Sequence, residues 1–165
     1  IDNLIRYGYA GTKDSTLFES TVCSFFSFMG YEAEWLGQGR GKVADVTAKY
    51  RASVYPESYG LIIDAKAYSK YTFPTNHVRA MKEYIRHHGK EMLQDMIPKH
   101  ALAFVSMSFS TPDEKLSEIA KDTSVNGTAI DAYTLIELSA QVSKQQISIA
   151  ELYPAFTTNK LFVCV

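Results

Sequence analysis

The sequence predicts an α/β fold in which a central mixed sheet carries helices on both faces. Along most of the chain, segments in which apolar residues recur at helical spacing are followed by short strand-like runs. These runs are either continuously apolar or switch between apolar and polar residues. The run Tyr59–Ile63 ends in Asp64 and Lys66 and has the character of a buried strand. The chain has 165 residues, 46% of them hydrophobic, which is enough for one well-cored domain and too little for two large ones.

The first expected helix spans residues 15–29, where apolar residues recur at helical spacing. Its start matches a capping box, with Thr16 and Glu19 three residues apart. A short strand at 32–35 and a glycine-rich turn at 37–41 follow. The turn is not a phosphate-binding loop, because it lacks the Gly-Lys-Ser/Thr ending and no helix opens after it.

Two strand-like runs, 43–50 and 59–67, form the next unit. The loop between them is short enough for an antiparallel hairpin and too short for a helical crossover. A symmetric hairpin pairs the last residue of the first run with the first residue of the second. The same register sets Asp45 opposite Asp64, unless a bulge intervenes.

The remaining segments alternate between the two types. They are expected as a helix at 75–95, a strand at 101–109, a helix from 112 to about 121, a strand at 128–131, helices at 133–145 and 148–156, and a last strand at 161–165. The helix from 112 has a strong start signal, because Thr111 can act as N-cap and Pro112 takes the first helical position.

Asp64 and Lys66 are the most informative residues of the chain. Two residues apart on a strand, they point to the same face and stand about 6.5–7 Å apart along it. A charge at the end of a buried strand is costly unless it is paired or functional. A bare Asp-x-Lys is otherwise common on surfaces, so its placement and the register with Asp45 are what favour a site.

This combination suits phosphodiester hydrolysis with a bound metal ion. Asp45 and Asp64 would hold Mg²⁺, the backbone carbonyl of Ala65 could add a third oxygen, and clustered carboxylates favour a cation. Lys66 would orient or help deprotonate the attacking water and stabilise the pentacovalent phosphorus. Glu19 is a further candidate acid, and its alternative role is the carboxylate of the capping box.

The basic and histidine residues gather between positions 77 and 100. The four histidines are His77, His87, His88 and His100. They include no His-x-x-x-His pair with a fitting third ligand, which argues against zinc. The basic residues there form either a solvated helix face or a surface toward phosphate or a partner. His77 alone is assigned to the active-site end.

The bulk composition limits the class of protein. The net charge is −1, less basic than a protein that holds DNA tightly by itself. The two cysteines give no disulfide framework, and neither a membrane-spanning stretch nor a signal peptide is present. The expected location is the bacterial cytoplasm. The chain begins with Ile1 rather than Met, so a short preceding piece is allowed for.

The segment Tyr59–Ser69 resembles the second catalytic strand of the PD-(D/E)XK nucleases, and within them the FokI-type cleavage domains of Type IIS restriction endonucleases. The likeness extends over most of the chain and thins after about residue 110. Its other matching positions are Phe25-Phe26, Gly30-Tyr31, Pro74, Met81, Tyr84, Ile85, Phe104–Ser106 and Asn126-Gly127.

The resemblance implies a three-layer α/β/α restriction-endonuclease-like core that cleaves duplex DNA with Mg²⁺. It makes Asp45 and Asp64 metal ligands and Lys66 the catalytic lysine, and it places Glu19 on a helix acid of the group. The usual proline before the first aspartate is replaced by Ala44. His77 stands where the FokI type has glutamine.

The resemblance also bears on partners. FokI-type domains pair through the helix after the Asp-x-Lys strand, where Arg79 and Glu83 reverse the usual order of acid and base. Residues 1–165 are expected to form a single nuclease domain without a separate DNA-recognition domain. The leading hypothesis is therefore the small subunit of a heterodimeric Type IIS endonuclease, directed by a large subunit that recognises DNA and cuts the other strand.

Two alternatives stay open at this point. One is a homodimeric PD-(D/E)XK nuclease for repair or junction resolution. The other is an inactive nuclease-like binding partner, against which the intact Asp45, Asp64 and Lys66 argue.

Overall fold

A computed structural model describes residues 1–37 and 43–164 of the chain. Its centre is one six-stranded sheet in the order β1-β2-β3-β4-β5-β6. The strands are β1 (Glu32–Trp35), β2 (Val46–Tyr50), β3 (Tyr59–Lys66), β4 (Lys99–Ser106), β5 (Gly127–Asp131) and β6 (Lys160–Leu161). The first three strands pair antiparallel and the last four pair parallel, which confirms the expected mixed sheet. The strands at the two edges, β1 and β6, are the short ones.

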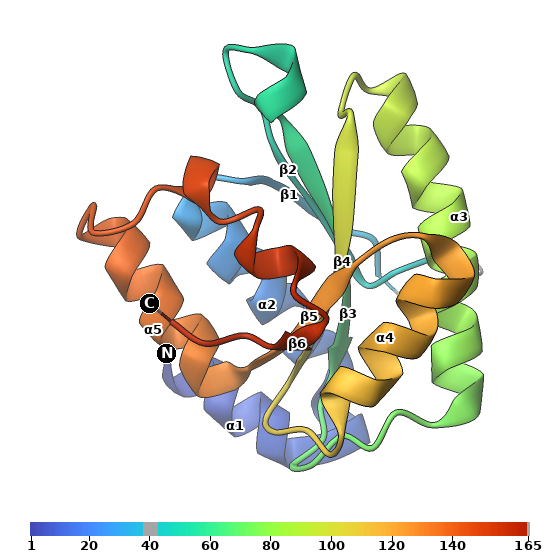
Figure 1. Cartoon of the computed structure of the whole chain (residues 1–165). Coiled ribbons are helices and arrows are strands. Elements are labelled where there is room, and N and C mark those ends of the chain that lie inside the picture. The colour runs from blue at the N-terminus through green and yellow to red at the C-terminus, as the bar shows by residue number, and fades with distance from the viewer. Residues whose placement is uncertain (38–42, 165) are drawn as a thin grey trace.

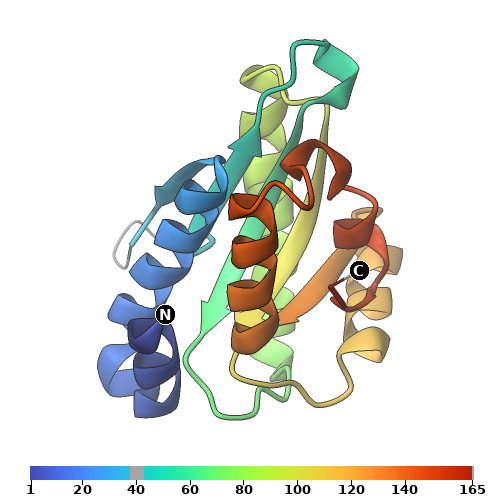
Figure 2. The same cartoon turned by 90° about the vertical axis from the view of Figure 1, so that its left-hand side faces the viewer.

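Helices cover both faces of this sheet. They are α1 (Asp2–Ala10), α2 (Ser15–Met29), α3 (Thr75–Gln94), α4 (Pro112–Thr123) and α5 (Ala132–Ser143). The two views show α3 and α4 on one face and α1, α2 and α5 on the other (Figures 1 and 2). The three-layer α/β/α architecture is therefore confirmed. No helix among the described residues is long and apolar enough to cross a membrane.

Each face of the sheet has its own apolar core, and β3 contributes to both. Leu61 and Ile63 belong to the core under α2 and α5, while Ile62 belongs to the core under α3 and α4. Side chains alternate along a strand, so Asp64 and Lys66 follow Ile62 on the α3 side of the sheet. They extend an apolar row at the carboxyl end of the strand.

The hairpin register is confirmed where β2 and β3 pair. Tyr50 lies opposite Tyr59, and Val46 lies opposite Ile63. Strand β2 is shorter than the expected 43–50, because the pairing of β2 with β3 shifts by one residue before Val46. There the amide of Asp45 donates to the carbonyl of Ile63 at 3.2 Å, so Asp45 immediately precedes β2 rather than pairing with Asp64 within the ladder.

Several expectations for the helices are wrong in detail. The capping box does not form: Asp14 is the N-cap of α2, and Thr16 lies inside the helix. Helix α1 and the 3₁₀ turn at Gly11–Asp14 before α2 were not expected. Thr111 is the N-cap of α4, but it has a φ of 49° and its side chain makes no capping bond.

The C-terminal region also differs from expectation. In place of a helix at 148–156, two 3₁₀ turns form, Ile149–Glu151 and Ala155–Thr157, because Pro154 interrupts regular helical bonding. The last strand is only Lys160–Leu161. The glycine-rich turn expected at 37–41 lies outside the described residues except for its first residue. A further 3₁₀ turn, Tyr55–Glu57, closes the β2–β3 hairpin.

Gly127 at the start of β5 is required by close packing against β4. A Cβ atom there would lie 2.8 Å from the backbone oxygen of Leu102 and closer still to that side chain. Gly127→Ala is therefore expected to destabilise the fold by about 1–3 kcal/mol, the usual cost of overpacking. Chemical denaturation of the two proteins measures this, and Gly37→Ala is a control for strain at positive φ without backbone overlap. Equal stability of Gly127→Ala and the parent would contradict the close packing.

Candidate active site

Asp45, Asp64 and Lys66 meet at the carboxyl end of β3. The ammonium Nζ of Lys66 lies 2.9 Å from Oδ1 of Asp64 and 3.5 Å from Oδ2 of Asp45. The Oδ2 atom of Asp45 also accepts a hydrogen bond from the amide of Ala65 at 2.8 Å. The two carboxylates and the lysine expected from the sequence are thus brought together, although Asp45 reaches the group from outside the β-ladder.

The group is buried, which sets its electrostatics. The side chain of Asp64 is 3% exposed, and those of Asp45 and Lys66 are 18% and 20% exposed. Burial and the negative charge of Asp64 raise the pKa of Asp45 well above its usual range, against the opposing effect of Lys66. Two carboxylates sharing one buried site disfavour each other's ionised form, so the site favours an additional cation.

Lys66 is held in its charged form. Burial lowers the pKa of its ammonium, but the carboxylates of Asp64 and Asp45 more than offset this and leave the pKa above the ordinary lysine value. A lysine that keeps its proton at neutral pH donates hydrogen bonds and positive charge. Of the roles expected for Lys66, orientation of the water and charge stabilisation fit this geometry better than removal of a proton.

Glu19 reaches the same end of the sheet from α2. It is only 4% exposed, and its Oε2 accepts from the indole Nε1 of Trp35 at 3.4 Å. Its charge contributes to the raised pKa of Asp45. Glu19 lines a cavity of about 200 Å³ together with Lys66 and His77. These contacts favour a role for Glu19 in the candidate site over a role in a capping box.

The comparisons with known proteins agree with this geometry. The family model for the FokI cleavage domain matches residues 1–163. The chain belongs to the FokI cleavage-domain family. The structure of restriction endonuclease FokI has a TM-score of 0.85 and 21% identity, and the structure of FokI bound to DNA has 0.84 and 22%. Both matches cover 98% of this chain and 30% of the FokI chain, and no curated protein matches.

Within this FokI-type nuclease domain, His77 lies beside the carboxylate group. Its Nδ1 is 3.0 Å from the hydroxyl of Tyr71, and the two rings stack at 5.9 Å. Burial and the charge of Lys66 lower the pKa of His77, which favours the neutral ring. Burial, followed by the charge of Asp64, raises the pKa of Tyr71, so its hydroxyl keeps its proton.

Sequence reasoning missed the part played by Ser106 in this FokI-type site. Its hydroxyl donates to the carbonyl of Lys66 at 2.7 Å and is 3.0 Å from that of Tyr68. These bonds fix the backbone just where β3 ends, which sets the direction of Lys66. The available signal was a fully buried hydroxyl residue closing the apolar strand β4, a position where an unpaired polar group is costly.

The donor set fits a hard divalent cation. Asp45 and Asp64 offer carboxylate oxygens, the ligands that Mg²⁺ prefers, and the charge of Glu19 acts on Asp45. The amide of Ala65 bonded to Asp45 keeps that peptide beside the two carboxylates. The contribution of the Ala65 carbonyl stays a prediction.

Proposed function

We propose that the chain is a Mg²⁺-dependent DNA endonuclease subunit that hydrolyses a phosphodiester in one strand of duplex DNA. The observation that carries the proposal is the buried group of Asp45, Asp64 and Lys66, within a domain of the FokI cleavage family. A purely structural role would not require two buried carboxylates, because each makes ionisation of the other more costly.

Each residue has a separate task in the proposed reaction. Asp45 and Asp64 would hold the metal ion, with the Ala65 carbonyl as a further ligand. The bound ion would supply Lewis-acid stabilisation of the phosphoryl oxygens and activation of water. Lys66, protonated and 2.9 Å from Asp64, would orient the attacking water and stabilise charge developing at the phosphate. Glu19 would add negative charge near Asp45, and His77 would offer a neutral ring near Lys66.

The proposal includes a separate large subunit that recognises DNA. A net charge of −1 supports borrowed rather than intrinsic DNA affinity. The contact is proposed on α3, where Arg79 is exposed. On the same helix Lys82 already pairs with Asp122 of α4 at 2.6 Å, so part of the basic surface is used within the domain. Residues 1–165 would serve as a single cleavage domain, acting in the bacterial cytoplasm.

Plasmid cleavage tests this proposal directly. Purified chain is incubated with supercoiled plasmid and Mg²⁺, with and without the candidate large subunit, and the products are separated as supercoiled, nicked and linear DNA. The expected result is double-strand cutting only with both subunits and Mg²⁺, and none with EDTA, because the charge of the site requires a cation.

Other outcomes of this experiment separate the alternatives. Sequence-specific linear product from the lone chain would contradict the two-subunit proposal and favour a homodimeric nuclease. Absence of cleavage with every partner and divalent metal would contradict nuclease activity and leave the binding-partner alternative.

A further inference from the structure

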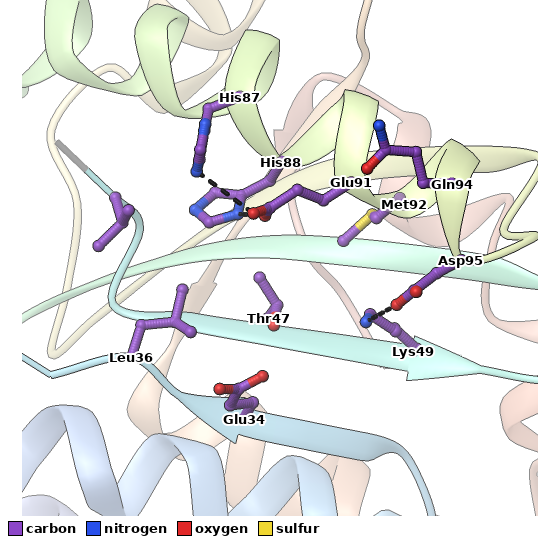
Figure 3. Close-up of a pocket in the computed structure, with 11 residues that line it drawn as sticks. Glu34, Leu36, Thr47, Lys49, His87, His88, Glu91, Met92, Gln94 and Asp95 are labelled. Atoms are coloured by element: carbon purple, nitrogen blue, oxygen red, sulfur yellow. Dashed lines mark hydrogen bonds and ion pairs between the residues drawn. The ribbon is translucent and has the colours of Figure 1, made fainter. Parts of the chain in front are cut away.

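His88 connects α3 to the segment that carries Asp45. It is 3% exposed, and its ring lies between the helix and the sheet (Figure 3). Its Nε2 accepts a hydrogen bond from the amide of Ala44 at 3.1 Å, and its Nδ1 lies 2.7 Å from Oε2 of Glu91. Because Glu91 also lies on α3, the two bonds join this helix to the segment before β2 at one buried imidazole.

The two bonds define the tautomer of His88. A backbone amide only donates, so Nε2 must present its lone pair to Ala44. The proton of a neutral ring is then on Nδ1, where it donates to the carboxylate of Glu91. Burial lowers the pKa of His88 despite the opposing charge of Glu91, which is consistent with the neutral ring.

The same side chains resemble a metal site, but their hydrogen bonds argue against one. Ligand atoms of His87, His88 and Glu91 lie within 4.8 Å of one another. A metal at Nδ1 of His88 would move the ring proton to Nε2, where it would face the amide hydrogen of Ala44. The exchange would replace a buried hydrogen bond by two opposed donors. His88 therefore serves the fold through Ala44 rather than through an ion.

The backbone at Asp45 lies just outside the β2–β3 ladder, and among the described residues three hydrogen bonds hold it and the residue before it. Its own amide donates to the carbonyl of Ile63, and its carbonyl accepts from the amide of Leu36 at 2.9 Å. The next peptide toward the N-terminus is held by the side chain of His88. Of these three bonds only the last comes from a side chain, so it is the one that substitution can remove.

We propose that His88 is a positioning residue for the active site, which holds the Ala44 peptide and thereby fixes the carboxylate of Asp45 beside Asp64 and Lys66. The inference rests on the proposed function insofar as Asp45 is a metal ligand. Its structural part concerns the backbone alone and is measurable without metal or DNA. The bonded amide of Ala44 is one residue away from Asp45. Loss of the bond from Ala44 to His88 is therefore expected to displace the carboxylate of Asp45 without removing it.

The test compares three variants with the parent chain. His88→Leu removes the acceptor but keeps an apolar side chain in the buried space. His88→Gln restores an acceptor, since the amide oxygen of glutamine falls near the position of Nε2. His87→Leu is the matched control, because His87 is the neighbouring residue and contacts Glu91 at 3.4 Å, whereas the described hydrogen bond to Ala44 comes from His88. Thermal melting establishes the folded fraction of each.

Two measurements follow. Amide hydrogen exchange of the metal-free chain is expected to accelerate at Ala44 and Ala65 in His88→Leu, relative to the core amide of Leu102, and to return toward parental rates in His88→Gln. The Mg²⁺ concentration for half-maximal cleavage, with the large subunit present, is expected to rise about 10–100-fold in His88→Leu, the usual effect of losing a group that orients a metal ligand. His87→Leu is expected to match the parent in both.

The outcomes distinguish this inference from the proposed function. If the parent chain cleaves DNA and His88→Leu retains parental exchange at Ala65 and parental Mg²⁺ dependence, the positioning role is wrong. Equal losses in His88→Leu and His88→Gln would also overturn it, because they would indicate packing rather than the hydrogen bond. If the parent chain cleaves no DNA, the proposed function fails, while the exchange measurement still decides whether His88 fixes Asp45.

Discussion

Asp64→Asn is expected to abolish cleavage of the second DNA strand while the chain stays folded. Metal binding contributes several kcal/mol of transition-state stabilisation and each 1.36 kcal/mol is tenfold in rate, so the loss should be about 10³-fold or more. The substitution also removes one of two buried carboxylates that share a single lysine. The melting temperature of the metal-free chain should therefore be equal or higher, with about 2–4 °C for each kcal/mol gained.

Single-turnover plasmid cleavage with the large subunit measures the first effect, and the expected product is nicked circle that does not become linear. Asp122→Asn is the matched control, because it makes the same chemical change at an ion pair between Lys82 of α3 and Asp122 of α4, whose side chain is half exposed. Parental rates are expected for the control. Linear product at the parental rate from Asp64→Asn would refute the assignment of the site.

Lys66→Met is expected to have the opposite effect on stability. It leaves Asp45 and Asp64 buried together without a cation, and breaking a buried pair by removing one partner costs about 3–5 kcal/mol. Mg²⁺ should restore part of this stability, because an ion that binds only the folded chain shifts the equilibrium toward it. Cleavage should also be lost, since no other ammonium reaches the two carboxylates among the described ion pairs.

Urea denaturation with EDTA and with Mg²⁺ gives the two free energies of unfolding. Lys82→Met is the control, because Lys82 also pairs with two carboxylates, those of Glu118 and Asp122, but both are about half exposed. The expected loss there is about 0–1 kcal/mol and insensitive to Mg²⁺. A Lys66→Met protein as stable as the parent in EDTA would mean that the carboxylates do not require a buried cation.

The sequence allowed the meeting of the three candidate site residues to be predicted because they are local. Asp45, Asp64 and Lys66 belong to one hairpin, whose register follows from loop symmetry, and Tyr50 indeed lies opposite Tyr59. The one-residue shift at Asp45 was not predictable, because it depends on backbone bonds to Ile63 and on a contact from a distant helix. Such bonds leave no periodic pattern in the chain.

The misassigned residues show where local patterns compete with tertiary structure. Thr16-x-x-Glu19 has the sequence of a capping box, but the chain enters α2 through a 3₁₀ turn that moves the N-cap to Asp14. The carboxylate of Glu19 instead accepts a hydrogen bond from Trp35 in β1.

His88 shows a different difficulty. The charged residues around it favour a solvated helix face, and this interpretation is wrong for His88. A signal was present nonetheless: Met81, Ile85, His88 and Met92 follow one another at helical spacing, and all four are buried. A histidine on an apolar stripe indicates a buried hydrogen-bonding role.

The short strands at the two margins of the sheet have a consequence for self-association. An exposed long edge invites another chain to add its own strand, but β1 offers four residues, two of them glutamates, and β6 offers two. Continuous sheets across two molecules are thereby disfavoured. Copies or partners of this domain are therefore expected to meet through surfaces other than these two sheet edges.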